Sequence, residues 1–100
     1  MACGAGDDDF VSAFEEKLLP AARRFKPEII LISAGFDSRK DDLLGCFALT
    51  DEGYVRLTRM IMQLAAECYA GRIVSVLEGG YNVDGLASAV MHHVRTLLDA

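Results

Sequence analysis

Two short segments place residues with reactive side chains directly after apolar runs. The run EIILIS at 28–33 is soon followed by Asp37, and the run RIVSVL at 72–77 is followed by EGGYN, which contains Tyr81. A carboxylate can bind a metal ion or act as a base, and a phenol can donate a hydrogen bond to a substrate oxygen as negative charge develops there. These two residues are therefore the first candidates for a functional site.

Each candidate also has a purely structural interpretation. Asp37 could be a turn residue or a local cap, because aspartate is common in turns. Tyr81 could be an ordinary packed tyrosine after a tight turn formed by Gly79 and Gly80. Those glycines could equally let the backbone approach a bound ligand closely, since they have no side chain. Taken one at a time, the residues leave both interpretations open.

Other titratable residues are expected to lie outside such a site. Asp41 and Asp42 fall further into the polar loop after Asp37, where solvation is expected. On a helical wheel His92 points toward solvent, and His93 lies at the margin of the apolar face as a half-buried packing residue. Both histidines lie well along their helix from the ends of the apolar runs, so we expect no catalytic role for them.

The apolar pattern predicts a first helix and two strands. Acidic residues 7–9 suit a helix start, and apolar residues recur at helical spacing after them. Pro20 should kink or interrupt this helix, and the FKP sequence at 25–27 should end it. The β-branched runs at 28–33 and 72–77 show no clean polar alternation, which is typical of strands buried on both faces of a parallel sheet.

Two further helices are predicted on either side of the second strand. One spans about 51–70, with Thr50 as N-cap and Gly71 as C-cap, and the other spans 83–98 with Asn82 as its cap. Their expected buried faces are, respectively, Tyr54, Leu57, Ile61, Leu64 and Cys68, and Val83, Leu86, Val90, Val94 and Leu97.

The order of elements, α-β-α-β-α, predicts an open α/β architecture with a right-handed β-α-β crossover. Ligands of such sheets bind outside the carboxyl ends of the strands, so Asp37 and Tyr81 should open onto the same edge. Two strands that are apolar on both faces need helices on both sides. Residues 1–100 are therefore interpreted as a fragment, the C-terminal part of a larger α/β domain that is incomplete as a catalytic domain.

The composition of the chain indicates which partners it is expected to bind and in which compartment it is expected to reside. The chain has 100 residues and a net charge of -5, and its basic residues are scattered, which argues against direct nucleic-acid binding. No segment resembles a signal peptide or a membrane span. Cys3, Cys46 and Cys68 are widely spaced and form no C-x-x-C motif, so we expect reduced thiols in a cytoplasmic protein, with Cys68 in the core.

Together the two segments resemble a known family. The stretch ILISAGFDSRKDDLLGCFALTDEGYVRLT, followed by SVLEGGYN, is similar to the C-terminal portion of histone deacetylases. That family also includes bacterial acetylpolyamine amidohydrolases and acetoin-utilisation proteins, and the EGGY form resembles its class II and bacterial branch. The resemblance covers nearly the whole chain, and it implies an arginase/deacetylase-like fold.

The resemblance also implies roles for particular residues. Asp37 matches a ligand of the catalytic zinc, and Tyr81 matches the phenol that donates to the substrate carbonyl, with Gly79 and Gly80 beside the substrate. The implied reaction is zinc-assisted hydrolysis of the acetyl amide in acetyl-lysine or acetylpolyamine. The family's Asp-x-His zinc ligands and its histidine pair lie upstream of the matching region, and neither is present here. The isolated chain is therefore expected to be inactive and to bind zinc weakly.

Two alternatives remain from other functional classes. The chain could be a non-catalytic remnant that binds a protein partner through an unpaired sheet edge or an exposed apolar face. It could also be a receiver-like signalling domain with Asp37 as phosphoacceptor, although LEGGYN offers no lysine where such a domain needs one. The oligomeric state is left open.

Overall fold

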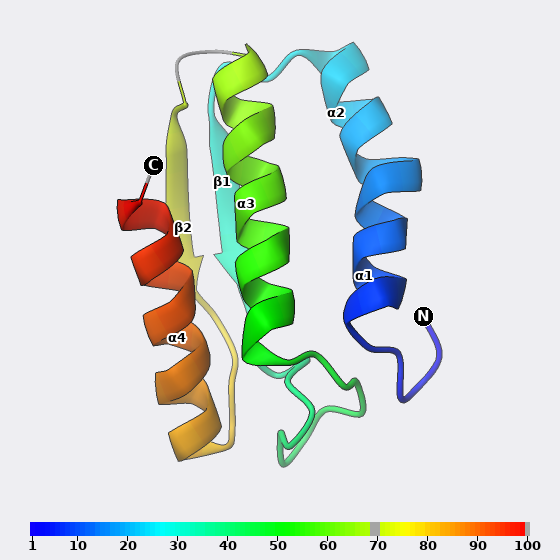
Figure 1. The fold of residues 1–100 in the computed structure, drawn as a ribbon, viewed down its shortest axis with the longest axis vertical. Coiled ribbons are helices and arrows are strands. Elements are labelled where there is room, and N and C mark those ends of the chain that lie inside the picture. The colour runs from blue at the N-terminus through cyan, green and yellow to red at the C-terminus, as the bar shows by residue number, and fades with distance from the viewer. Residues whose placement is uncertain (69–70, 100) are drawn as a thin grey trace.

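The computed structural model describes residues 1–68 and 71–99, and it has the predicted order of elements (Figure 1). These elements are α1 (Asp7–Ala13), the π-helical turn η1 (Phe14–Leu18), α2 (Leu19–Phe25), β1 (Ile30–Ala34), α3 (Asp51–Cys68), β2 (Ile73–Leu77) and α4 (Val83–Leu98). β1 and β2 pair in parallel, from Ile30 opposite Ile73 to Ala34 opposite Leu77. α3 connects the two strands, so the predicted β-α-β crossover is confirmed.

The first helical segment begins and ends where the sequence predicts. The Asp9 carboxylate accepts a hydrogen bond from the Gly6 N–H at 3.0 Å, which caps the start of α1. Pro20 has no N–H to donate, and the turn before it, η1, widens into a π-helix, so the expected interruption is confirmed. α2 ends at Phe25, and Lys26 adopts a left-handed conformation with φ of 57°.

Side-chain caps define the starts of α3 and α4. The Thr50 hydroxyl oxygen accepts from the Gly53 N–H at 3.1 Å, and the Asn82 side chain accepts from the Gly85 N–H at 2.9 Å. Both caps were predicted, since these residue types satisfy the free N–H groups of a first helical turn. The predicted end of α3 at residues 69 and 70 lies outside the described residues. No helix in the part of the chain that the structure covers is long and apolar enough to span a bilayer.

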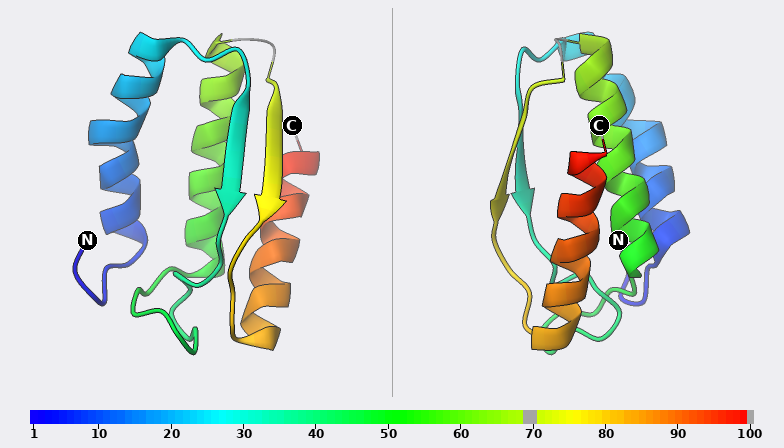
Figure 2. Two further views of the ribbon diagram at one scale, coloured as in Figure 1. Left: turned by 180° about the vertical axis from the view of Figure 1, so that it is seen from behind. Right: turned by 60° about the vertical axis from the view of Figure 1, so that its left-hand side comes forward.

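The hydrophobic core lies on one face of the sheet. It consists of Val11, Ala34, Phe36, Leu49, Tyr54, Leu57 and Ala89. Figure 2 shows that the described helices all lie on this side, with the strands forming the other surface. On the bare face Leu31 is 71% exposed and Val76 is 55% exposed. We expected both faces of the sheet to be buried. Within residues 1–68 and 71–99, only one face is.

α4 buries only part of the predicted face, since Leu86 and Val90 pack against the core as expected. Val83 and Val94, which the apolar pattern placed in the core, are 80% and 45% exposed. The buried positions include Ala89, His93 and Thr96 instead. The most buried positions of α4 carry small or hydrogen-bonding side chains, so hydrophobicity alone gave the wrong centre for its buried face.

His93 is buried between α3 and β2, more deeply than the predicted half-buried position. The Thr58 hydroxyl donates to the Tyr54 carbonyl, so its oxygen must accept from Nδ1–H of His93 at 2.8 Å. Nε2 of His93 then accepts from the Ser75 hydroxyl at 2.9 Å. These partners assign the neutral imidazole with its proton on Nδ1, and His93 therefore joins α3, β2 and α4.

We predict that the stability of this chain decreases below about pH 6.5 because of His93. Burial lowers the pKa of His93 from its usual 6.5, so the unfolded chain takes up a proton at a higher pH than the folded chain. The contribution is complete above the unfolded pKa and is lost as pH falls toward the folded pKa. Urea denaturation between pH 7.5 and 5.5 measures it. His93→Gln should remove the dependence and His92→Gln should keep it; equal slopes in both variants would contradict the prediction.

The expectation that the cysteines are reduced thiols was wrong for Cys3 and Cys46. Cys3 and Cys46 form a disulfide across a sequence separation of 43 residues, and the Gly4 N–H donates to the Cys46 carbonyl at 2.7 Å. Wide spacing hides this pair because the loop before α3 folds back onto the N-terminal segment. Cys68 is free but only half-buried at the end of α3, rather than part of the core cluster. The cytoplasmic location stays a prediction, and the disulfide weighs against it, since such bonds persist mainly in oxidising compartments.

Candidate functional site

Hydrogen bonds between the two chain segments continue past the ends of the strands. The Glu78 N–H donates to the Ala34 carbonyl at 2.9 Å, and the Phe36 N–H donates to the Gly79 carbonyl at 2.8 Å. Phe36 is itself buried in the core, which fixes this crossing point. The loop that carries Asp37 and the loop that carries Tyr81 therefore leave the sheet side by side.

Asp37 and Tyr81 face the same small space on either side of Gly79. A methyl group added at Gly79 would lie 3.0 Å from Oδ2 of Asp37 and 3.4 Å from the hydroxyl oxygen of Tyr81. Tyr81 is 47% exposed, so its phenol is open to a ligand arriving from outside. The structure thus brings together the two residues that the sequence placed at one edge of the sheet, and glycine at 79 leaves the room between them.

Glycine is required at position 80 by the backbone conformation and by close packing. Its φ is +143°, and an added methyl group would lie 2.6 Å from Cδ1 of Leu86 and 3.2 Å from Cβ of Phe36. The residue therefore needs both the backbone freedom and the small size of glycine. It sets the path by which the chain turns from β2 into α4. Glu78 is exposed at the start of this turn, where its carboxylate accepts from the Ser33 hydroxyl at 2.7 Å.

A charged network ties the loop after Asp37 to both neighbouring helices. Arg39 donates to the two carboxylate oxygens of Asp51 at 2.9 and 3.2 Å and also pairs with Asp41. The Ser88 hydroxyl on α4 donates to Asp51 as well, at 2.5 Å. Hydrogen bonds from Arg39 are the main cause that lowers the pKa of Asp51 to about 2. Asp51 therefore stays ionised at neutral pH and holds the loop, α3 and α4 together.

Asp42 is not solvated in the way the sequence suggested. Its Oδ1 accepts from the Tyr81 N–H at 2.7 Å, and its Oδ2 accepts from the N–H groups of Leu44 and Gly45 at 2.9 and 2.8 Å. The expectation failed because the main partner is 39 residues away in the chain. A local signal did exist, since aspartate often accepts from the backbone two residues further on.

The remaining acidic residue of this loop also contacts the turn before α4. The Asn82 side-chain amide donates to the Asp41 carbonyl at 3.1 Å. Asn82 thereby uses its oxygen to cap α4 and its nitrogen to bind the loop. Both Asp41 and Asp42 therefore contact the segment that carries Tyr81.

Tyr54 lies behind Asp37 and was not recognised from the sequence as part of this region. Its ring packs on Phe36 with the ring centres 5.1 Å apart. Among the described residues its buried hydroxyl has no hydrogen-bond partner. Burial, and then the charge of Asp37, raise the pKa of Tyr54 well above its usual value. Tyr54 is therefore a neutral, buried neighbour of the candidate site.

The described residues do not by themselves form a metal site. Within residues 1–68 and 71–99, no three histidine, cysteine, aspartate or glutamate side chains lie close enough together to hold an ion. Asp37 can supply one oxygen ligand, whereas a catalytic zinc needs three protein ligands. A zinc ion bound at this edge of the sheet would need further ligands from outside this set of residues.

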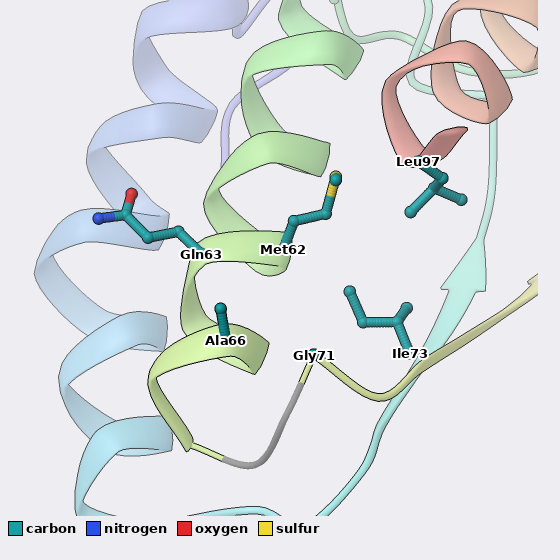
Figure 3. Close-up of a pocket in the computed structure, with 6 residues that line it drawn as sticks. All are labelled: Met62, Gln63, Ala66, Gly71, Ile73 and Leu97. Carbon is teal, nitrogen blue, oxygen red and sulfur yellow. The ribbon is translucent and has the colours of Figure 1, made fainter. Parts of the chain in front are cut away.

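The two histidines and a pocket between α3, β2 and α4 involve residues other than Asp37 and Tyr81. Nδ1 of His92 hydrogen bonds with the Ser88 carbonyl on its own helix, 2.7 Å away, and His93 is buried in the core. Figure 3 shows the residues that line a pocket at the other end of the sheet, where α3 ends and β2 begins. The volume of this pocket is about 450 Å³. Its lining residues are Met62, Gln63, Ala66, Gly71, Ile73 and Leu97. Within the part of the chain that the structure describes, none of these lining residues carries a charged side chain.

The fold and the loop geometry define an α/β chain with its candidate site at the carboxyl edge of a parallel sheet. The family model of the histone deacetylase domain matches residues 1–97. Histone deacetylase 15 of Arabidopsis thaliana is 39% identical over 95 residues, and polyamine deacetylase HDAC10 of Homo sapiens is 45% identical over 95 residues. The chain therefore belongs to the histone deacetylase family, as the sequence motifs predicted.

Solved structures agree with this assignment. The HDA15 HD domain superimposes with a TM-score of 0.89 at 37% identity, covering 98% of this chain and 27% of that chain. The histone deacetylase Clr3 gives a TM-score of 0.90 at 36% identity, covering 98% of this chain and 16% of that chain. The alignments with the two curated relatives include 95% of this chain. They span only 16% of histone deacetylase 15 and 14% of HDAC10. The predicted deacetylase-like α/β fold is confirmed.

Proposed function

We propose that this chain is the C-terminal part of a zinc-dependent deacetylase that hydrolyses the acetyl amide of an acetylated amine. Membership of the histone deacetylase family supports the class of reaction. The single observation that carries the proposal is the placement of Asp37 and Tyr81 on either side of Gly79. Acetyl-lysine in proteins and acetylpolyamines are the proposed substrates, and the matched relatives are named as histone and polyamine deacetylases.

In this proposal Asp37 and Tyr81 divide the work at the acetyl carbonyl. Asp37 supplies one carboxylate oxygen to the zinc, and its other ligands come from outside these 100 residues. When bound, zinc polarises the acetyl carbonyl and makes a water molecule more acidic. Tyr81 donates its hydroxyl proton in a hydrogen bond to the carbonyl oxygen, which stabilises the negative charge that develops there. Gly79 leaves room for the acetyl group between the two side chains.

The bare face of the sheet supports the proposal that the catalytic domain is larger than this chain. Parallel sheets are normally covered on both faces, and here β1 and β2 leave apolar side chains exposed on one of them. Leu31, Val74 and Val76 are the exposed strand residues. The rest of a deacetylase domain would cover this face and bring the missing histidines and zinc ligands to Asp37.

We predict that the isolated chain retains less than about one tenth of an equivalent of zinc, because one carboxylate is a weak site. A completed domain is obtained by placing residues 1–100 in the HDA15 HD domain, in place of the segment that matches them. It should retain about one equivalent and hydrolyse an acetyl-lysine peptide or acetylpolyamine. Metal analysis after dialysis and an acetate-release assay provide the readouts.

The matched variants are Asp37→Asn and Asp41→Asn in the completed domain. Asp37→Asn should lose most of the zinc and the activity, whereas Asp41→Asn should keep both. Full zinc and activity in Asp37→Asn would overturn the proposed role of Asp37. Stoichiometric zinc and turnover in the isolated chain would show that the proposed missing ligands are not needed.

The same exposed face favours a second candidate function, a non-catalytic module that binds a protein partner. Exposed apolar patches commonly mark interaction sites. Under this hypothesis Val76→Asp on the bare face weakens partner binding, and Tyr81→Phe leaves it unchanged. Under the enzyme proposal Tyr81→Phe removes activity in the completed domain. Comparing Val76→Asp with Tyr81→Phe therefore distinguishes the binding function from the enzymatic one.

A further inference from the structure

The carboxylate of Asp42 links the two loops that carry the candidate catalytic residues. Its Oδ1 binds the backbone N–H of Tyr81, and its Oδ2 binds the N–H groups of Leu44 and Gly45. Each oxygen is therefore used on a different segment of the chain. A carboxylate can do this because both of its oxygens accept hydrogen bonds, whereas an amide has only one acceptor.

The segment on the Oδ2 side also contacts Asp37. Gly45 packs directly on the backbone carbonyl of Asp37, so closely that a methyl group added there would overlap it. Asp42 and Gly45 thus form a short connection from the backbone of Asp37 to the backbone of Tyr81.

The ionised form of Asp42 is favoured in the folded chain. Partial removal of water would raise the pKa of Asp42, but backbone N–H groups of Tyr81, Leu44 and Gly45 outweigh this and lower it below its usual value. The carboxylate is therefore charged at neutral pH, and its hydrogen bonds with these donors are stronger than those of a neutral acceptor.

We propose that Asp42 is a positioning residue for Tyr81, which holds the backbone of Tyr81 at a fixed place relative to Asp37. The inference rests on the proposed function, because it assigns Asp42 a purpose through the phenol of Tyr81. Asp42 itself does not touch the substrate. Its effect on the reaction comes from geometry, since small displacements of a catalytic group can cost up to about 100-fold in rate.

The first test measures the hydrogen bond directly in the 100-residue chain. Amide hydrogen exchange of Tyr81, followed by NMR, should show protection that disappears in Asp42→Ala, which removes both acceptor oxygens, and persists in Asp41→Ala. Asp41 is the matched control because it lies in the same loop, and its carboxylate pairs with Arg39 instead. An exchange rate of the Tyr81 amide that is the same in wild type and Asp42→Ala would overturn the proposal.

The second test separates positioning from a general loss of structure. In the completed domain, Asp42→Ala should lower kcat about 10-fold to 100-fold with little change in KM. In a Tyr81→Phe background the same substitution should change kcat by less than about two-fold, because the phenol through which Asp42 acts is absent. An equal drop in both backgrounds would mean that Asp42 only supports the fold, and it would overturn the proposal.

The two tests also distinguish this inference from the proposed function. If Tyr81→Phe leaves full activity in the completed domain, the proposed role of the phenol is wrong, and with it the catalytic purpose of Asp42. Loss of amide protection in Asp42→Ala would still establish that Asp42 fixes the Tyr81 backbone. If Tyr81→Phe is inactive but the amide is unprotected in wild type, the proposed function survives and the positioning role is overturned.

Discussion

Tyr81→Phe in the completed domain should lower kcat by about 10²- to 10³-fold, with zinc content and fold unchanged. The hydroxyl of Tyr81 faces Asp37 across Gly79, where it can donate to the oxygen of a substrate carbonyl. Removing one such donor commonly costs this much, because the charge that develops on the oxygen loses its partner. Steady-state kinetics with an acetyl-lysine peptide or acetylpolyamine measures the loss.

Phenylalanine keeps the ring of residue 81, and the backbone bond to Asp42 is also kept. The variant therefore removes one oxygen and little else. Tyr54→Phe is the matched control, since the hydroxyl of Tyr54 is buried and lies behind the candidate site. We expect it to keep activity within about ten-fold, as for a group outside the reaction. Full activity in Tyr81→Phe, or equal losses in both variants, would contradict the assigned role.

Gly45→Ala should lower the free energy of unfolding by about 2 to 3 kcal/mol, as for an overpacked site that cannot relax. An added methyl group would overlap the backbone carbonyl of Asp37 and would lie 3.5 Å from Oδ2 of Asp42. Backbone atoms cannot rotate out of the way as a flexible side chain can. Urea denaturation of the chain, followed by circular dichroism, measures the change.

Gly6→Ala provides the control for this substitution. Gly6 lies in the same region, and a methyl group there would be 3.6 Å from the Ala48 carbonyl oxygen, which is ordinary contact. We expect a cost within about 1 kcal/mol, since only the first turn of α1 is affected. If both variants were equally stable, the close packing of Gly45 on Asp37 would not exist in solution.

Local signals explain why much of the fold could be predicted. Thr50 and Asn82 cap their helices through hydrogen bonds to nearby N–H groups, so residue type and spacing are sufficient. The effect of Pro20 on the helix before it is equally local. The shared edge of Asp37 and Tyr81 follows from parallel pairing, because parallel strands end on the same side of a sheet.

What could not be predicted depends on contacts between distant segments. Asp42 binds Tyr81 across 39 residues, and Cys3 pairs with Cys46 across 43. The buried face of α4 follows its fit against α3, where Ala89 and His93 are buried and Val94, which hydrophobicity favours, is exposed. In each case the local sequence is compatible with a solvated or differently oriented side chain. The partner that decides between them is fixed only in the folded chain.

The disulfide described above makes residues 3–46 a closed covalent ring. Lys40 is exposed on the loop inside this ring, between Asp37 and Cys46. A single peptide-bond cut after Lys40 would therefore leave residues 1–40 and 41–100 joined as one molecule until the disulfide is reduced. The two sides of the candidate site, Asp37 on one piece and Tyr81 on the other, would stay tethered after the chain that links them had been severed.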